Sequence, residues 1–320
     1  MKNADVTIIL PIYNEAEHLS ETLDSIIQQT YPNIQIYISD NASTDNSLSI
    51  AESYAEKDSR IKVFKQPKNV AASENFNFLI NRSDTEYTSL IGGHDLLKED
   101  CIECCKNKMN LSDSISCVFP KASYFGKANK LKSANSNIDL YTDSKFLRVK
   151  KVINNLKAGT ALYSMYRTAV LQKIIIKPIR GADLWWLVQI ANTGSIISTD
   201  SVLYLRREDR IENKYQKKKR YIKSVGLSQD QYKFDSVILN LCNFINSELD
   251  IPKADRIYLS KLVIRKYQSL GIVGTKSLLK MGEYNSVKRA LLTEYFSNVP
   301  YMLYRDFNRK IRNFKAVINR

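Results

Sequence analysis

The sequence has little of what disulfides and metal centres require. It contains five cysteines, an odd number, and only two histidines, His18 and His94, in 320 residues. Cys101, Cys104 and Cys105 lie close together, but no second Cys or His pair follows at the spacing of a zinc site, which argues against structural zinc. The odd cysteine count and the lack of an N-terminal stretch typical of a signal peptide lead us to expect a reduced, cytoplasmic setting.

Long apolar runs and a glycine-rich phosphate loop are also missing. No run of about 18 apolar residues occurs, which argues against a transmembrane helix. The first predicted strand-to-helix turn has no glycine-rich loop of the kind that cradles phosphates, which argues against a nucleotidyltransferase. The chain is 44% hydrophobic over its 320 residues, enough for one large domain and a smaller appendage.

Acidic residues are scarce towards the C-terminus. Residues 206–320 carry 25 Lys and Arg against 11 Asp and Glu, whereas residues 1–205 carry 23 against 22. Nearly all of the formal net charge of +15 is therefore C-terminal. Such an asymmetry indicates either an acidic partner, anionic lipid or nucleic acid, or a solvated basic face. No recognised nucleic-acid motif with interleaved aromatic residues accompanies it, so we expect no nucleic acid partner.

The most informative stretch is residues 6–45. An apolar, β-branched run at residues 6–10 predicts a central strand buried on both faces, and we expect Pro11 to end it because proline cannot donate to a ladder. Apolar residues at helical spacing follow in residues 17–29, and residues 34–39 form a second β-rich run. The pattern predicts an α/β fold with a mostly parallel central sheet.

Two polar loops follow these strands, at residues 11–15 and 40–45. Open α/β sheets bind ligands outside the carboxyl ends of their strands. Tyr13 offers a ring that can stack on a base, and Asp40 offers a carboxylate that can accept a base or ribose hydrogen. These side chains either bind a nucleotide or only pack and cap a generic βαβ unit, and spacing alone does not separate the two interpretations.

The amino-acid sequences of the two loops resemble those of a known family. PIYNE at residues 11–15, followed by DNASTD at residues 40–45, resembles the opening of the family 2 glycosyltransferases, which use nucleotide-diphosphate sugars. The resemblance implies a GT-A-type domain over residues 1–208. After it, a dense basic run and helical patterns without a convincing strand predict a basic, mainly helical region over residues 209–320. It also implies a sugar donor, most readily a UDP-sugar, and a glycan or lipid-linked acceptor in cell-surface polysaccharide biosynthesis.

A carboxylate-bearing turn, Gly92-Gly93-His94-Asp95, follows the strand predicted at residues 87–91. Hard cations take oxygen ligands and neutralise phosphate charge, so this turn suits a diphosphate with its divalent ion. The resembled family has an Asp-x-Asp motif here, which implies Asp95 as the ligand of Mn²⁺ or Mg²⁺. His94 either adds a nitrogen ligand or, as we prefer, hydrogen-bonds a phosphate or backbone group. The first carboxylate of the motif is missing, which leaves a catalytically inactive nucleotide-sugar binder as the alternative.

An acidic residue, Asp183, precedes an apolar helix. It occupies an N-cap-like position, so capping explains it as well as chemistry does on spacing alone. The resemblance implies that Asp183 is the general base that takes a proton from the acceptor hydroxyl in an inverting displacement. Trp185 and Trp186, which follow it, either stack on a sugar or pack in the core.

The resemblance implies a wider set of donor contacts. A basic residue after the last strand faces the diphosphate in this family, which implies Arg206 or Arg207 here. The expected nucleotide-sugar contacts are Pro11, Tyr13, Glu15, Asp40, Asn69, His94, Arg206 and Arg207.

The last segment of the chain has one apolar stripe. Its members recur at spacings of four, four, three and four: Leu303, Phe307, Ile311, Phe314 and Ile318. Arg and Lys residues occupy the other faces, a pattern typical of a helix that lies in a membrane interface and equally of a C-terminal helix packed on its own domain. The first interpretation predicts peripheral attachment to an anionic membrane, at the inner face of the cell membrane.

Overall fold

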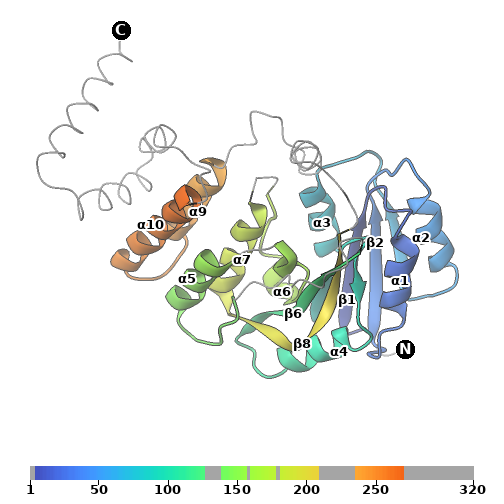
Figure 1. The fold of residues 1–320 in the computed structure, drawn as a ribbon, viewed down its shortest axis with the longest axis horizontal. Coiled ribbons are helices and arrows are strands. Elements are labelled where there is room, and N and C mark those ends of the chain that lie inside the picture. Colours follow the sequence, from blue (N-terminus) through green and yellow to red (C-terminus); the bar gives the residue numbers. More distant parts are fainter. Residues whose placement is uncertain (1–3, 127–137, 157–158, 178–180, 209–234, 270–320) are drawn as a thin grey trace, which may run out of the picture. The chain divides into compact units, whose positions relative to one another are not determined.

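The chain divides into two compact units, residues 1–233 and 234–320. The computed structural model describes residues 4–126, 138–156, 159–177, 181–208 and 235–269 (Figure 1). The described part of the second unit is a pair of helices in contact, α9 (Asp235–Ser247) and α10 (Lys253–Ser269). The domain boundary predicted between residues 208 and 209 falls at the start of a stretch outside the described residues. The apolar stripe of residues 303–318 lies wholly outside them.

The first unit is built on one eight-stranded sheet with the order β3-β2-β1-β4-β7-β6-β8-β5. Strands β1, β2, β3 and β4 run parallel, while β7 is antiparallel to β4 and β6, and β5 is antiparallel to β8. The predicted, mostly parallel α/β sheet is therefore confirmed. The strands are β1 (Val6–Ile12), β2 (Ile34–Asp40), β3 (Ile61–Lys65), β4 (Tyr87–Leu90), β5 (Leu96–Leu97), β6 (Ile115–Phe125), β7 (Met165–Arg167) and β8 (Ser195–Arg207).

Helices connect and cover these strands. Figure 1 shows the parallel strands between α3 on one side and α1 and α2 on the other. The helices of this unit are α1 (Leu19–Ile27), α2 (Ser47–Ala55), α3 (Ala72–Ile80), α4 (Cys101–Met109), α5 (Lys145–Asn155), α6 (Thr168–Leu171) and α7 (Ala182–Thr193), with a 3₁₀ turn, η1, at Gly159–Leu162. Among the residues that the structure describes, no helix has the length and apolar character to cross a membrane.

Strand β1 is the centre of the core, and it corrects one prediction. Its residues from Val6 to Leu10 are fully buried, as the apolar run predicted. The strand does not end at Pro11 but continues to Ile12, with Pro11 opposite Ser39 of β2. The backbone carbonyl of Ile9 accepts a hydrogen bond from Ile91 N, on the β4 side of the strand. Residues two apart in a strand direct their backbone N–H and C=O groups to the same side, so the nitrogen of Pro11 also faces the β4 side. Pairing with β4 ends at Ile9, so no partner strand requires an N–H from Pro11.

Candidate functional site

The loops after β1, β2 and β4 meet at one edge of the sheet, because these three strands are parallel. The first two loops are bonded to each other. Asn14 and Ala42 both have a φ of 54°, in the left-handed region that residues other than glycine seldom adopt. The cross-links are Asn14 N to Ser43 Oγ (3.0 Å), Thr44 N to Asn14 Oδ1 (2.8 Å), Glu15 N to Ser47 Oγ (2.8 Å) and Ala16 N to Asp45 Oδ2 (3.1 Å).

Asp45 anchors this junction as an ionised carboxylate. Burial opposes its charge, but hydrogen bonds from Ser47 and Ala16 outweigh it and hold the pKa of Asp45 below its usual value. The DNASTD stretch therefore serves two purposes. Its last carboxylate fixes the loops together, and its first, Asp40, lies at the base of the site.

Asp40 is 1% exposed and only half satisfied. Its Oδ2 accepts a hydrogen bond from Ser43 N at 3.0 Å, whereas its Oδ1 is buried and has no hydrogen-bond partner among the described residues. A buried carboxylate oxygen without a donor is costly, since it has lost its water and gained nothing in return. Asp40 is thus prepared to accept a hydrogen from a ligand.

Asn41 is a site residue that the sequence did not single out. Its side chain accepts from Val70 N and donates to Val70 O, both at 2.8 Å, and its carbonyl accepts from Asn69 Nδ2 at 3.0 Å. Asn41, the residue after Asp40, therefore holds the predicted contact residue Asn69 close to Asp40. A buried Asn directly after Asp40 was a possible signal, but its partner lies 29 residues further along the chain.

The turn at residues 92–95, here called the acidic turn, is held mainly through Asp95, which is 1% exposed. Its Oδ2 accepts a hydrogen bond from the Tyr204 hydroxyl at 2.6 Å, and its Oδ1 accepts from Arg207 N at 2.9 Å. A side chain at position 92 would displace the Asp95 carboxylate, because a Cβ there would lie 2.8 Å from Asp95 Oδ2. Burial and the charge of Asp95 raise the pKa of Tyr204 well above its ordinary value, so the hydroxyl keeps its proton.

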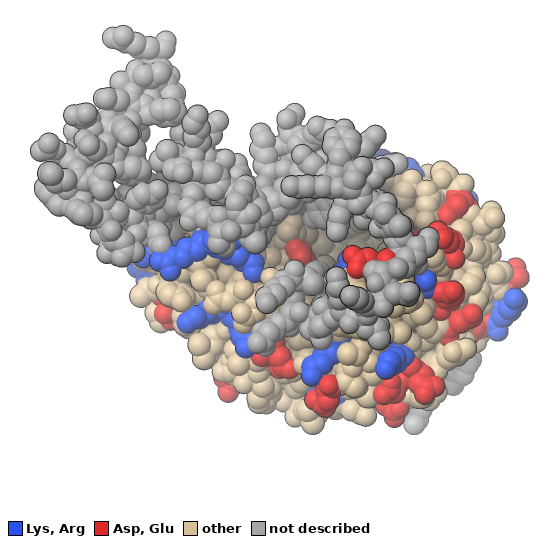
Figure 2. Space-filling view, viewed as in Figure 1, with Lys and Arg blue, Asp and Glu red and all other residues tan. Residues whose placement is uncertain are grey.

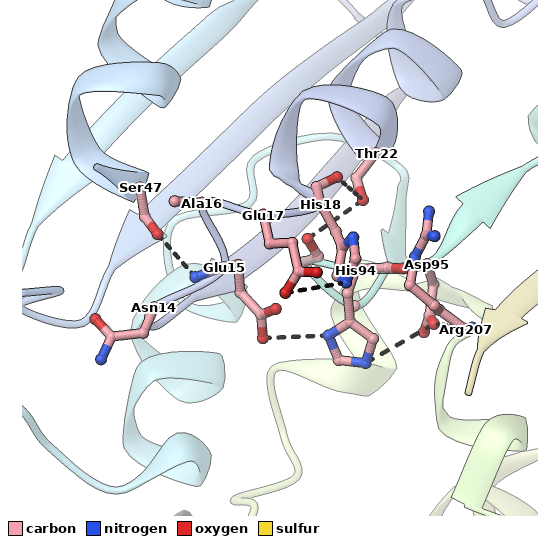
Figure 3. Close-up of polar contacts among 12 residues, drawn as sticks. Asn14, Glu15, Ala16, Glu17, His18, Thr22, Ser47, His94, Asp95 and Arg207 are labelled. Carbon is pink, nitrogen blue, oxygen red and sulfur yellow. Dashed lines mark hydrogen bonds and ion pairs between the residues drawn. The ribbon is translucent and has the colours of Figure 1, made fainter. Parts of the chain in front are cut away.

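His94 lies between two carboxylates, as Figure 3 shows. Its Nδ1 is 3.1 Å from Glu15 Oε1, and its Nε2 is 3.9 Å from Asp95 Oδ1. Glu15 fills the space beside the turn, because a Cβ on Gly93 would lie 2.9 Å from Glu15 Cγ. A side chain at position 93, where the family motif has its first carboxylate, would collide with Glu15. The carboxylate on that side of His94 is instead Glu15, from the neighbouring loop.

The two arginines after β8 differ in environment. Arg207 donates from Nε to His94 O at 3.0 Å, and this bond braces the acidic turn. Arg207 also forms an ion pair with Glu21 and lies 4.5 Å from the centre of the Phe125 ring. Burial opposes the charge of Arg206, yet Tyr163 and Asp95 raise the pKa of its guanidinium. Arg206 therefore adds a cation close to Asp95.

The donor set of the acidic turn suits a divalent ion that is shared with a phosphate ligand. Within the described ranges, no group of three or more His, Cys, Asp or Glu side chains could hold a metal by itself. Mg²⁺ is commonly bound by one or two carboxylates, and phosphate oxygens and waters supply its other ligands. Asp95 Oδ1 retains one lone pair beyond its bond to Arg207 N, so Asp95 with His94 is compatible with this chemistry.

Asp183 lies on a different element, in the first turn of α7. The prediction of an N-cap-like position is wrong: the helix is capped by Gly181, whose φ of 78° starts the turn and whose carbonyl accepts from Leu184 N at 3.1 Å. Asp183 Oδ1 accepts from the same N–H at 3.0 Å. The sequence could not locate the cap, because several residues before the helix were compatible with it.

The two tryptophans after Asp183 are core residues. Trp185 is 6% exposed and Trp186 is 1% exposed. Trp186 stacks on Tyr166 of β7, with ring centres 5.6 Å apart and planes inclined by 21°, and meets Phe76 of α3 edge-on. Of the two interpretations offered for these residues, packing accounts for their position.

The remaining predicted donor contacts lie at the same edge. Pro11 is partly buried near the end of β1, and Tyr13 is half-buried in the loop that follows. Of the predicted site residues, Glu15, His94 and Asp95 are in direct contact, through the two ion pairs of His94. On the surface drawn in Figure 2, side chains of both charges are interspersed, in keeping with the balanced charge of residues 1–205.

Comparison with known proteins gives a consistent result. Residues 7–175 match the sequence profile of the family described as Glycosyl transferase family 2. The glycosyltransferase GlyG of Streptococcus pneumoniae is 32% identical over 109 residues, 34% of this chain and 36% of GlyG. The chondroitin synthase of Pasteurella multocida is 25% identical over 114 residues, 36% of this chain and 12% of that enzyme. The chain thus spans well under half the length of these relatives.

Solved structures share the fold. The crystal structure of S. aureus TarS 1–349 in complex with UDP-GlcNAc superposes with a TM-score of 0.65 at 18% identity, covering 83% of this chain and 73% of that one. A mannosyltransferase from Pyrobaculum calidifontis in complex with GDP-Man and Mn²⁺ superposes with a TM-score of 0.51 at 13% identity, covering 93% and 89%. At these identities the likeness concerns the arrangement of helices and strands.

Proposed function

The chain belongs to glycosyl transferase family 2 and has its GT-A fold, and from this premise we propose that it transfers a sugar from a UDP-sugar to an acceptor hydroxyl with inversion at the anomeric carbon. The observation that carries the donor assignment is the buried Asp40 oxygen without a partner among the described residues. It lies where the loops after β1 and β2 are bonded together, at the ligand-binding edge of the sheet.

The single open oxygen of Asp40 favours uracil over guanine. Uracil presents one imide N–H between two carbonyls, which matches one acceptor oxygen. Guanine presents two adjacent donors, N1–H and an amino group, and would need both carboxylate oxygens, so its second hydrogen bond would have to share Oδ2 with Ser43 N. Tyr13, half-buried in the adjoining loop, supplies a ring to pack against the base.

The diphosphate is proposed to lie at the acidic turn. Asp95 and His94 would hold Mn²⁺ or Mg²⁺, which when bound neutralises the charge of the leaving diphosphate. Arg206, whose guanidinium stays charged next to Asp95, adds to that neutralisation. The turn lacks the first carboxylate of the family motif, which suggested an inactive relative. We propose that Glu15 of the adjoining loop, which contacts His94, takes the place of that carboxylate.

Asp183 is proposed as the general base that takes the proton of the acceptor hydroxyl. A carboxylate is ionised at neutral pH and suits this step, and its place in the first turn of α7 fixes its backbone. The name of the matched chondroitin synthase indicates a polysaccharide product, and we extend to this chain a growing polysaccharide as acceptor. The alternative of a lipid-linked acceptor comes from the sequence and stays part of the proposal. Peripheral attachment to a membrane through residues 303–318 and a cytoplasmic location belong to the same proposal.

The test of the donor assignment is nucleotide binding by calorimetry with Asp40→Asn. Loss of one charge-assisted hydrogen bond should weaken UDP affinity by about 1.5–3 kcal/mol, roughly 10- to 150-fold. GDP should bind the wild-type chain more weakly than UDP. The matched control is Asp84→Asn, which removes an exposed carboxylate just before β4, at the opposite edge of the sheet, and should leave UDP affinity unchanged.

Two outcomes contradict the assignment. Equal UDP affinity in wild type and Asp40→Asn would remove Asp40 from the donor site. Absence of UDP binding to the wild-type chain, with Mn²⁺ or without, would overturn the nucleotide-sugar proposal as a whole.

A further inference from the structure

The hydroxyl of Tyr204 has two partners, and their chemistry fixes the direction of each bond. It lies 2.6 Å from Asp95 Oδ2 and 3.2 Å from the backbone nitrogen of Gly92. The Gly92 N–H can only donate, so the tyrosine oxygen accepts from it. The one hydroxyl hydrogen then points to Asp95 Oδ2, which accepts it at 2.6 Å. Tyr204 therefore satisfies the first residue of the acidic turn and the last one together.

Strand β8 controls both oxygens of Asp95. Oδ2 is held by the side chain of Tyr204 and Oδ1 by the backbone nitrogen of Arg207, three residues further along the same strand. Directly after Asp95, strand β5 pairs with β8, with Leu96 opposite Leu205. The carboxylate is thus fixed by a strand that lies more than 100 residues away in the sequence.

The ring of Tyr204 is itself immobilised. Tyr204 has no exposed surface, and it stacks on Tyr163 with ring centres 5.5 Å apart and planes inclined by 16°. A ring held on its face has one position for its hydroxyl. The Asp95 carboxylate consequently has one orientation before any ligand arrives.

We propose that Tyr204 is a positioning residue of the donor site, whose hydroxyl holds the Asp95 carboxylate in the orientation that receives the diphosphate and its divalent ion. This inference rests on the proposed function. Residues that orient a metal ligand from behind commonly change metal affinity by about 10- to 100-fold when their hydrogen bond is removed. Tyr204 acts through Asp95 and is not expected to contact the donor.

The experiment measures UDP affinity of the full chain by calorimetry, once with Mn²⁺ and once with a chelator. In the wild type Mn²⁺ should tighten UDP binding. Tyr204→Phe keeps the stacked ring and loses the hydroxyl, so its affinity with Mn²⁺ should fall by about 10- to 100-fold. Its affinity in chelator should equal that of the wild type, because the Asp40 part of the site is untouched. Asp95→Ala should show the same pattern.

The matched control is Tyr87→Phe. Tyr87 is also a buried tyrosine, 1% exposed, and its hydroxyl bonds to Asn110 Oδ1 at 2.8 Å, away from the acidic turn. It should bind UDP as the wild type does in both conditions. If Tyr204→Phe does not fold, Gly92→Ala replaces it, since its Cβ would lie 2.8 Å from Asp95 Oδ2 and would displace the same carboxylate. The same loss, confined to the Mn²⁺ condition, is expected.

Three results would overturn the positioning role. The first is wild-type affinity of Tyr204→Phe in the presence of Mn²⁺, and the second is an equal loss with Mn²⁺ and with chelator, which would indicate general damage. The third is a wild-type chain that binds UDP equally in both conditions, which removes the metal from the site and leaves the nucleotide assignment standing. Absence of all UDP binding to the wild type would instead refute the proposed function, and the positioning role with it.

Discussion

Two buried aspartates at the same edge of the sheet have opposite hydrogen-bonding states. Asp40 leaves one oxygen without a partner among the described residues, whereas Asp95 has a donor on each oxygen. An open, desolvated acceptor gains most from a ligand N–H, whereas a carboxylate with one donor on each oxygen gains a fixed orientation and still keeps a lone pair on each oxygen for a metal ion. At the scale of the residue, Asp40 therefore suits recognition of a base and Asp95 suits the placing of charge.

Asp183→Asn tests the general base. Asparagine has nearly the same shape and retains an oxygen that can accept from Leu184 N, but it cannot take a proton from the acceptor. Turnover should fall by about 10²- to 10⁴-fold while UDP affinity stays unchanged. The measurement is transfer from the UDP-sugar that best stabilises the chain against heat, with the anomeric configuration of the product read by NMR.

The matched control for this change is Asp200→Asn. The Asp200 carboxylate is exposed and pairs with Lys108, and its substitution should leave turnover at the wild-type level. A near-normal rate in Asp183→Asn would remove it as the base, and a product with retained configuration would refute the single displacement.

At the scale of the element, α7 depends on α5 for its C-terminal end. Arg148 of α5 is 6% exposed and donates to Ala191 O at 2.7 Å and to Asn192 O at 3.4 Å, at the last turn of α7, and also to Thr142 O at 2.7 Å. A cation at a helix C-terminus meets the negative end of the helix dipole and the carbonyls that have no partner within the helix. Because α7 carries Asp183, this buried contact supports the element that presents the proposed base.

Arg148→Met should lower the free energy of unfolding by about 1–3 kcal/mol, because it leaves buried carbonyls without a donor. Urea unfolding of the full chain, followed by tryptophan fluorescence of Trp185 and Trp186 in α7, measures the change. Lys151→Met is the control, since Lys151 lies on the same helix and is only partly buried. A midpoint for Arg148→Met within error of that for Lys151→Met would show that the cap contributes nothing.

At the scale of the whole molecule, charge is distributed unequally along the chain. Residues 206–320 hold an excess of 14 basic residues, 25 less 11, out of a net charge of +15. The apolar stripe of residues 303–318 lies within this region, outside the described residues, so its role is a prediction from sequence. Each basic residue near an anionic surface contributes about 1 kcal/mol to binding.

Vesicle co-sedimentation tests membrane attachment. The full chain should bind vesicles rich in anionic lipid at low salt and leave them at high salt, because screening weakens the attraction of exposed charges. A chain that ends at Asn298 should bind less, as it lacks the stripe and its flanking Arg and Lys residues. Equal binding by both chains, or binding by neither, would contradict attachment through this segment.

The sequence alone determined the features that depend on neighbouring residues. Burial of one strand and one helix face follows from local periodicity, so β1, α1 and β2 and the polar loops that follow β1 and β2 were predictable. The composition of those loops and of the turn at residues 92–95 pointed to Asp40 and Asp95. A rule that proline ends a ladder was wrong for Pro11, because it depends on whether a partner strand lies on that side.

Only the tertiary structure decided which residues hold these side chains in place. Asn41 meets Val70, Asp95 meets Tyr204 and Arg148 meets the end of α7, at separations of 29, 109 and 43 residues. Tyr204 lies in a short apolar run, residues 202–205, and nothing in this local pattern distinguishes its hydroxyl from that of another core tyrosine such as Tyr87. Hydrogen bonds of this kind are selected by the packing of the whole sheet, since the strands must first be paired before the two atoms can meet.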